Sequence, residues 1–229
     1  MNARFKNRRE AGWSLAKKLE HYGGRDDVVV LALPRGGVPV GYEVAVRLKV
    51  PLEIFLVRKL GVPGHEEYAM GAIASGGLWF VNDEVVRQIG ITREQIKRIV
   101  EREEQELERR TENYGTEFSR GDVRGQTVIL VDDGLATGST MRAAIAALKQ
   151  KHPAKIVVGV PVASSSTCEE LEREVDEVVC VRQPGHFYAV GEWYEDFSQT
   201  SDDEVRELLH RAREQFEPAH VAPVWPPGF

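Results

Sequence analysis

The chain has 229 residues, of which 42% are hydrophobic and 29% are charged, and its formal net charge at pH 7 is −6. This apolar content is sufficient for the core of one large α/β domain and argues against general disorder. The negative charge disfavours nonspecific nucleic-acid binding, and no apolar run approaches the ~20 residues of a membrane-spanning helix, so we expect neither nucleic acid nor membrane as a partner.

The N-terminus and the two cysteines indicate the compartment. Residues 1–6 lack the apolar core of a signal peptide. Cys168 and Cys180 do not have the spacing of metal ligands, and two buried, reduced thiols are the simpler interpretation. The sequence therefore predicts a cytoplasmic protein.

The N-terminal quarter predicts a helix, a strand and a second helix. Apolar residues four positions apart predict an amphipathic helix over residues 8–22. The apolar run at 28–33 predicts a buried parallel strand, and a helix is expected over 38–48. The turn between them, Arg35-Gly36-Gly37, has two interpretations. It is either a ligand-binding loop at the carboxyl end of a strand or a plain βα turn.

The next segment predicts another strand, over residues 51–57, that ends at Arg58 and Lys59. Such cations are usually solvated, although here they could contact an anion at the edge of the sheet. Residues 60–78 are rich in glycine and have no clear period, which is typical of a lid over a ligand. Three titratable residues in this segment could act as acids or bases, but solvated loop residues are the simpler interpretation. They are His65, Glu66 and Glu67.

Residues 92–113 are densely charged and predict a long helix. The apolar stripe of this helix is narrow, and several oppositely charged pairs lie four positions apart. We therefore expect a largely exposed helix that is supported in part by ion pairs. A contact with a partner subunit, or a hood over a substrate, is the alternative.

The strongest motif lies at residues 128–141. Four apolar residues predict a buried strand, Asp132 and Asp133 follow at its carboxyl end, and a turn of small residues leads into a helix. The turn and the helix start bring backbone N–H groups together, which favours phosphate binding. Carboxylates accept hydrogen bonds from hydroxyls, so the motif suits a sugar phosphate. The turn consists of Ala136, Thr137, Gly138, Ser139 and Thr140.

This motif resembles the phosphoribosyl diphosphate (PRPP) signature of type I phosphoribosyltransferases. The resemblance implies that Asp132 and Asp133 bind the ribose hydroxyls and that residues 136–140 bind the 5-phosphate. It implies Mg²⁺ as the cofactor, bound through PRPP, with the two acids as candidate protein ligands. A Walker A loop is excluded because Gly138 is not followed by lysine, and the three glycines of a dinucleotide fingerprint are absent.

The resemblance also extends to the N-terminal loops. It places Arg35, Gly36 and Gly37 at the pyrophosphate of PRPP, together with Lys59 as first choice and Arg58 as second. Arg35 and Lys59 would then be the catalytic cations, because they would stabilise the charge of the leaving diphosphate.

The C-terminal third predicts two more strands, at 155–160 and 177–181, with a helix between them that Ser166 or Thr167 could cap. Residues 184–198 contain five aromatic residues without a helical or strand period. Their rings could form a hood that stacks on a planar base, or they could form a satellite apolar cluster under a loop. The hood candidates are Phe187, Trp193 and Tyr194.

The sequence thus predicts an α/β fold with an open, mostly parallel β-sheet flanked by helices, in one domain over residues 1–217. We expect a helical insertion at about 84–118, a C-terminal hood and a flexible, proline-rich tail at 218–229.

The resemblance implies transfer of the 5-phosphoribosyl group from PRPP to a nitrogenous base with release of pyrophosphate, by a homodimer. Enzymes acting on 6-oxopurines commonly have an acid at the position of Ala136, so a 6-oxopurine acceptor is not expected. One alternative is a regulatory protein that senses PRPP or a nucleotide without catalysis. Another is an enzyme acting on a different ribose phosphate, such as a hydrolase or a phosphorylase.

Overall fold

The computed structural model describes residues 4–75, 77–115 and 123–216. Its centre is a five-stranded sheet in the order β2-β1-β6-β7-β8, in which every neighbouring pair is parallel. Every residue of β1 and β6 is buried, as expected for continuous apolar runs covered on both faces. The predicted α/β fold is therefore confirmed. The strands are β1 (Val28–Ala32), β2 (Leu52–Ile54), β6 (Thr127–Val131), β7 (Lys155–Val162) and β8 (Glu177–Arg182).

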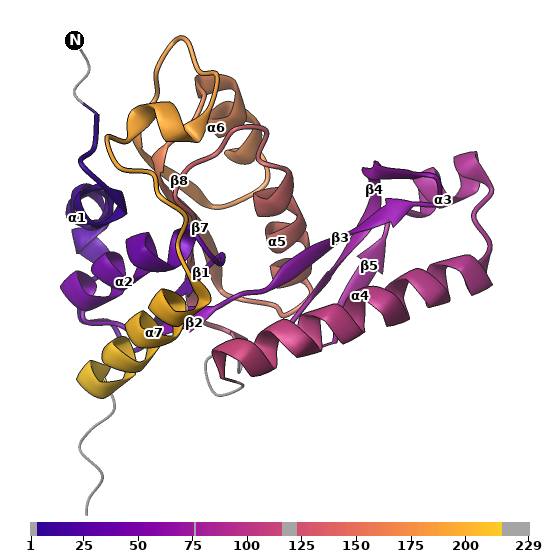
Figure 1. The fold of residues 1–229 in the computed structure, drawn as a ribbon, viewed down its shortest axis with the longest axis horizontal. Helices are drawn as coiled ribbons and strands as arrows, with labels where there is room; N and C mark the ends of the chain where they lie inside the picture. Colours follow the sequence, from indigo (N-terminus) through magenta and orange to yellow (C-terminus); the bar gives the residue numbers. More distant parts are fainter. Residues whose placement is uncertain (1–3, 76, 116–122, 217–229) are drawn as a thin grey trace, which may run out of the picture.

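Helices cover both faces of this sheet (Figure 1). Val28 and Val30 of β1 belong to one hydrophobic cluster together with α1, α2 and α7, whereas Val29 and Leu31 belong to a second cluster together with α5 and α6. This alternation follows from the period of two in a strand. The helices are α1 (Arg8–Lys18), α2 (Gly37–Leu48), α5 (Ser139–Lys149), α6 (Ser165–Leu171) and α7 (Asp202–Phe216). A single turn of 3-10 helix, η1 (Glu20–Tyr22), follows α1, so the first helix is shorter than predicted.

A second, antiparallel sheet of order β3-β4-β5 corrects two predictions. The strand predicted over 51–57 is divided, since β2 ends at Ile54, and Arg58 and Lys59 lie inside β3. Residues 60–78 are also more regular than expected, because β3, β4 and β5 account for most of the segment, and its closure over a ligand stays a prediction. The strands are β3 (Val57–Val62), β4 (His65–Ala74) and β5 (Leu78–Val81).

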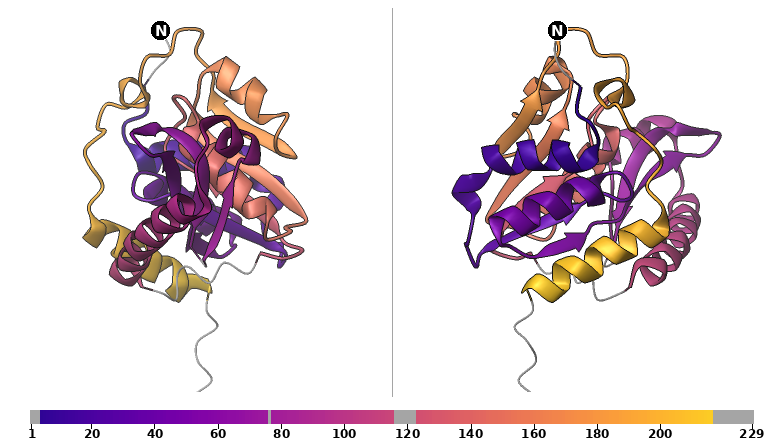
Figure 2. Two further views of the ribbon diagram at one scale, coloured as in Figure 1. Left: turned by 90° about the vertical axis from the view of Figure 1, so that its right-hand side faces the viewer. Right: turned by 60° about the vertical axis from the view of Figure 1, so that its left-hand side comes forward.

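Two helices complete this part of the chain, α3 (Asp83–Ile89) and α4 (Arg93–Tyr114). A capping box between Thr92 and Gln95 starts α4. Its apolar stripe packs on the antiparallel sheet and shares a cluster with Leu60 and Met70, so the chain itself covers this stripe. Figure 2 shows α4 passing beside the start of α7. The expected insertion corresponds to α3 and α4, while residues 116–118 and the predicted tail lie outside the described residues.

Among the described residues, no helix combines the length and the apolar character that crossing a bilayer requires.

Candidate functional site

The two predicted ligand-binding loops lie in contact. Since β1 and β6 are parallel neighbours, their carboxyl ends meet at the same edge of the sheet. A Cβ atom added to Gly36 would lie 2.1 Å from Oδ2 of Asp133, and one added to Gly37 would lie 2.7 Å from the backbone oxygen of Val131. At Gly37 the obstacle is backbone, so only glycine fits there, and at Gly36 any side chain would have to displace the carboxylate of Asp133. The sequence-predicted pyrophosphate loop and acid pair therefore form one site.

The acid pair is partly buried. Oδ1 of Asp132 accepts a hydrogen bond of 2.8 Å from the backbone N–H of Asp133. Burial, followed by the charge of the neighbouring Asp133, raises the pKa of Asp132 well above its ordinary value. Burial also raises the pKa of Asp133, although the guanidinium of Arg8 acts in the opposite direction. Ionised carboxylates at this site are therefore stabilised by hydrogen bonds from hydroxyl groups or by contact with cations.

Arg8 is a site residue that the sequence analysis missed. Its Nε donates to Oδ2 of Asp133 at 2.8 Å, its Nη1 donates to the backbone oxygen of Ser198 at 2.7 Å, and its guanidinium lies 4.0 Å from the ring centroid of Phe197. The side chain is only 12% exposed. One signal was present in the sequence, because a cation in the first turn of a helix opposes the helix dipole and needs another reason to be there.

The predicted phosphate turn at residues 136–140 leads into α5. Gly138 has φ 68°, in the left-handed region that favours glycine, and its backbone oxygen accepts from the N–H of Arg142 at 2.8 Å. The other four residues of the turn, those flanking Gly138, are exposed. The turn thus begins a helix and presents its polar groups to solvent, as phosphate binding requires.

Thr167 of α6 supports this turn from behind. Its hydroxyl donates to the backbone oxygen of Ala136 at 2.9 Å, and its methyl carbon would lie 3.0 Å from a Cβ atom added to Gly138. The predicted cap of α6 is wrong, because Ser164 is the N-cap and its hydroxyl accepts from the N–H of Thr167 at 3.1 Å. Thr167 therefore takes part in the first turn of α6 through its N–H and supports the phosphate turn through its hydroxyl.

Arg35 lies between the acid pair's edge of the sheet and the place where the end of α4 meets the start of α7. Its Nη1 is 3.8 Å from Oδ1 of Asp202, the first residue of α7, and the same oxygen accepts from the hydroxyl of Tyr114 at 2.7 Å. Burial, followed by this hydrogen bond, raises the pKa of Tyr114 to about 12. Arg35 is 39% exposed, so its guanidinium is accessible to a ligand.

Arg58 and Lys59 lie elsewhere than expected. They belong to β3 beside the start of α5, not to the carboxyl end of a parallel strand. Arg58 donates from Nε to Glu103 of α4. Lys59 lines two cavities that flank the phosphate turn, one with Thr140 and one with Ser139.

Part of the aromatic segment packs in an apolar cluster, as the second interpretation of residues 184–198 expects, whereas Tyr188 is exposed. Tyr194 is only 3% exposed, its ring lies 5.6 Å from that of Phe5, and its hydroxyl donates to the backbone oxygen of Asp133 at 2.6 Å. Phe187 and Trp193 are partly buried against the same cluster. Tyr194 thus supports the backbone of Asp133, and its ring is buried and not available to stack on a base.

The remaining candidates, His65, Glu66 and Glu67, belong to β4 of the antiparallel sheet and not to the turns that follow β1 and β6. His65 is exposed at the start of β4, and only the backbone of Glu66 and Glu67 is described. Within the described ranges, no three His, Cys, Asp or Glu side chains are grouped closely enough to hold a metal ion by themselves.

The chain resembles known proteins over most of its length. Residues 7–198 match the family described as "Phosphoribosyl transferase domain". Two proteins of Mycobacterium tuberculosis, "Putative phosphoribosyl transferase MT0597" and "Putative phosphoribosyl transferase Rv0571c", are each 42% identical over 212 residues, or 93% of this chain. The match covers 48% of each, so the chain spans about half the length of these curated relatives.

A solved structure shows the same fold. The crystal structure of TT1426 from Thermus thermophilus is 40% identical, covers 91% of this chain and 98% of that chain, and has a TM-score of 0.82. The family match and the two loops that meet at the sheet edge agree. The chain belongs to the phosphoribosyl transferase domain family.

Proposed function

We propose that this protein transfers the 5-phosphoribosyl group of PRPP to a nitrogenous base and releases pyrophosphate. The observation that carries this proposal is the contact of the Gly36-Gly37 turn with Asp133, at the edge where the phosphate turn also begins. A ligand that occupied all three parts would need hydroxyls for the acids and a phosphate group at each end. PRPP has this composition.

In this proposal Asp132 and Asp133 bind the ribose hydroxyls, residues 136–140 bind the 5-phosphate, and Arg35, Gly36 and Gly37 bind the diphosphate. A ring nitrogen of the base forms a bond to the anomeric carbon while the bond from this carbon to the diphosphate oxygen breaks. Negative charge grows on the leaving diphosphate, where Arg35 would stabilise it, and positive charge grows on the ribose above the acids.

Lys59 remains a prediction as the second catalytic cation, because it lies beside the phosphate turn but in β3 of the antiparallel sheet, whereas Arg35 follows β1 of the parallel sheet. Arg58 is the weaker candidate for a diphosphate contact, since Glu103 already accepts from its Nε.

The donor set fits Mg²⁺ held mainly through PRPP. Mg²⁺ usually keeps several waters and combines one or two carboxylates with substrate phosphates, and the site offers Asp132 and Asp133. Asp132 is the better candidate ligand, because Arg8 already contacts the carboxylate of Asp133. When bound, the ion would neutralise part of the diphosphate charge.

The acceptor is proposed to be a base other than a 6-oxopurine, because Ala136 supplies no acid at its position in the turn. Phe187 and Trp193 remain candidates for a contact with that base, since both are only partly buried. A homodimer in the cytoplasm, without nucleic-acid or membrane partners, completes the proposal.

The decisive experiment replaces both acids, Asp132→Asn with Asp133→Asn, and titrates PRPP with Mg²⁺ by calorimetry. We expect an affinity loss of at least ~100-fold, because amides accept weaker hydrogen bonds from hydroxyls than carboxylates do. The matched control is Asp26→Asn with Asp27→Asn, an exposed pair before the amino end of β1, which should bind PRPP as the native chain does. Unchanged PRPP affinity in a folded Asp132/Asp133 variant would refute the proposal.

Pyrophosphate release against a panel of bases, in the same samples, distinguishes the functions. Release with one base identifies the transferase and its acceptor. PRPP binding without release for any base would instead identify the regulatory alternative.

A further inference from the structure

A cavity of about 330 Å³ lies between β3, α4 and the start of α5. Its lining is strongly charged, since four cationic side chains face it and one carboxylate accompanies them. They are Arg58, Lys59, Arg102 and Arg110, with Glu103. The chain as a whole has a formal net charge of −6, so a cluster of four cations is contrary to its overall negative charge. It therefore needs a local explanation.

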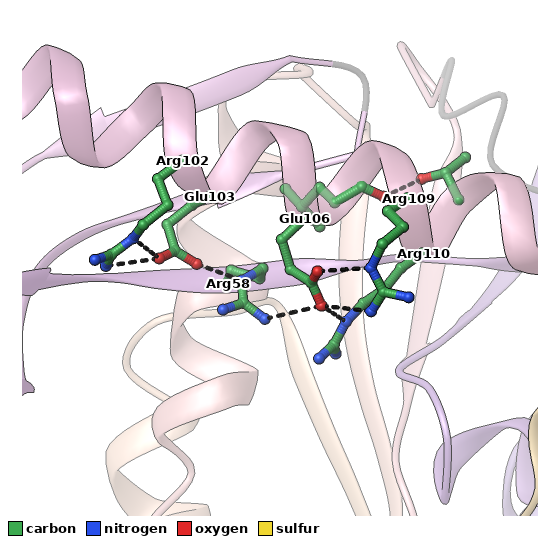
Figure 3. Close-up of polar contacts among 8 residues, drawn as sticks. Arg58, Arg102, Glu103, Glu106, Arg109 and Arg110 are labelled. Carbon is green, nitrogen blue, oxygen red and sulfur yellow. Dashed lines mark hydrogen bonds and ion pairs between the residues drawn. The ribbon is translucent and has the colours of Figure 1, made fainter.

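Two glutamates of α4 hold the arginines in place (Figure 3). Glu103, which packs with the apolar stripe, accepts from Nε of Arg58 and from Nε and Nη2 of Arg102, the latter two at 3.0 and 2.9 Å. One turn later, Glu106 accepts from Nε of Arg110 at 2.8 Å and from Nε and Nη2 of Arg109 at 2.8 and 2.9 Å. The hydrogen bonds from Arg109 and Arg110 lower the pKa of Glu106 to about 2.

This geometry orients guanidinium groups beside the cavity. Each guanidinium carries five N–H donors in a planar fork, so the arginines bonded to Glu103 and Glu106 offer more donors than these two carboxylates can accept. Guanidinium forks pair well with phosphate oxygens, and they do so best when their orientation is fixed beforehand.

The cavity adjoins the site proposed for PRPP and shares with it the two cationic candidates Arg58 and Lys59, but its other cations, Arg102 and Arg110, have no part in that site. The phosphate turn contributes Thr140 to its lining, but neither the acid pair nor the turn at residues 35–37 is part of the lining that the structure describes. A PRPP molecule that reached from the phosphate turn to Arg35 would lie over Asp132 and Asp133 instead. The cavity thus lies beside the 5-phosphate position, on the side of α4.

We propose that this cavity binds a second phosphate-bearing ligand, one that carries two or more linked phosphates and is distinct from PRPP. The cavity is large enough for a small oligophosphate chain, and its cations lie on two elements, β3 and α4, so that successive phosphates could contact different arginines. This inference goes beyond the proposed transferase and does not depend on it.

The test uses inorganic tripolyphosphate as the probe, titrated by calorimetry into the full chain without Mg²⁺, which the probe would chelate. The variant is Arg102→Gln with Arg110→Gln, two side chains that are 61% and 45% exposed, so folding should be retained. The control is Arg93→Gln with Arg98→Gln, two exposed arginines on the same helix that carry the same total charge. PRPP is then titrated with Mg²⁺ into all three proteins.

We expect the native chain and the control to bind tripolyphosphate with similar affinity and the cavity variant to bind at least ~10-fold more weakly, while PRPP affinity stays the same in all three. Three outcomes would overturn the proposal. The first is that the native chain does not bind tripolyphosphate. The second is an equal loss of tripolyphosphate affinity in the variant and the control, which would reflect charge alone. The third is a parallel loss of PRPP affinity in the cavity variant, which would make the cavity part of the PRPP site. If the native chain does not bind PRPP, the proposed function fails, and the tripolyphosphate result still decides this inference.

Discussion

Arg8 and Asp133 are 125 residues apart in the chain, yet the guanidinium of Arg8 holds the carboxylate of Asp133 at 2.8 Å. The hydroxyl of Tyr194 holds the backbone oxygen of the same aspartate. Asp133 is thus fixed through both its side chain and its main chain before any ligand binds. Such fixation reduces the ordering that a ligand must bring about, which is one way in which binding sites gain affinity.

Replacing Arg8 tests how much its ion pair with Asp133 contributes to the free energy of unfolding. We expect Arg8→Gln to lower the free energy of unfolding by about 1–3 kcal/mol, because a partly buried carboxylate loses its charged partner. Adding Asp133→Asn should recover part of that loss, since no unpaired charge remains. Urea denaturation of the single and double variants measures both effects. Lys17→Gln, an exposed position on the same helix, is the control and should change stability by less than ~0.5 kcal/mol. If Arg8→Gln lowers the free energy of unfolding equally in the native chain and in the Asp133→Asn variant, the two residues are not coupled.

Sequence reasoning found the parts of the site that local chemistry defines. Asp132, Asp133 and the turn at 136–140 form one continuous strand–turn–helix segment, so adjacent residues reveal it. The supporting residues could not be found in this way. Thr167 contacts the turn across 31 residues of chain, and Tyr194 contacts Asp133 across 61. The aromatic segment that contains Tyr194 stands out in the sequence, but whether the ring of Tyr194 stacks on a ligand or supports an acid depends on tertiary packing.

Sequence reasoning likewise located most of the parallel strands and missed the antiparallel ones. The central strands β1, β6 and β7 are apolar runs buried almost throughout, and their predicted ends differ from the observed ones by at most two residues, whereas the strand predicted over 51–57 ends three residues earlier, at Ile54 of β2. The antiparallel strands were missed because their pattern is interrupted. The register between β3 and β4 shifts on both sides of Gly61, and a Cβ atom at Gly71 would lie 2.0 Å from the backbone oxygen of Phe80. Glycines that serve close strand packing therefore look like loop residues in the sequence.

The contact between α4 and α7 makes a prediction for alkaline pH. Tyr114, the last residue of α4, donates to Asp202, the first residue of α7, and its pKa is raised to about 12 from an ordinary value of 10. Because the folded state holds this proton more tightly than the unfolded state, the stability from this group is complete below pH 10 and is lost as pH rises towards 12.

We therefore expect Tyr114→Phe to be less stable than the native chain at pH 8, by about 1 kcal/mol for the lost hydrogen bond. Across the interval in which Tyr114 ionises, the stability of the variant should fall less steeply than that of the native chain. Urea denaturation at a series of pH values measures the two slopes. Parallel slopes would show that the titration of Tyr114 is not linked to folding.

Across the whole molecule, the antiparallel sheet is not separate from the parallel one. One hydrophobic cluster contains Ile54 of β2, Leu60 of β3, Met70 of β4 and Leu107 of α4, together with residues of α1, α2 and α7. Elements that share a continuous core lose it together when they unfold. This shared core favours a single cooperative unit, which is the prediction of one domain over residues 1–217.

Leu60→Ala tests that prediction, because Leu60 is fully buried in the shared cluster and lies outside the proposed PRPP site. The cavity it leaves should lower the free energy of unfolding by ~2–5 kcal/mol. Pulsed hydrogen exchange across a urea series reports unfolding separately for peptides of β4 and of β6, and we expect the two midpoints to coincide and to fall by the same amount. The control, Ile89→Ala, removes a side chain that is 47% exposed on α3 and should shift neither midpoint appreciably. If β4 unfolds at lower urea than β6, and Leu60→Ala widens that interval, the antiparallel sheet with α3 and α4 is a unit of its own and the single-domain prediction is wrong.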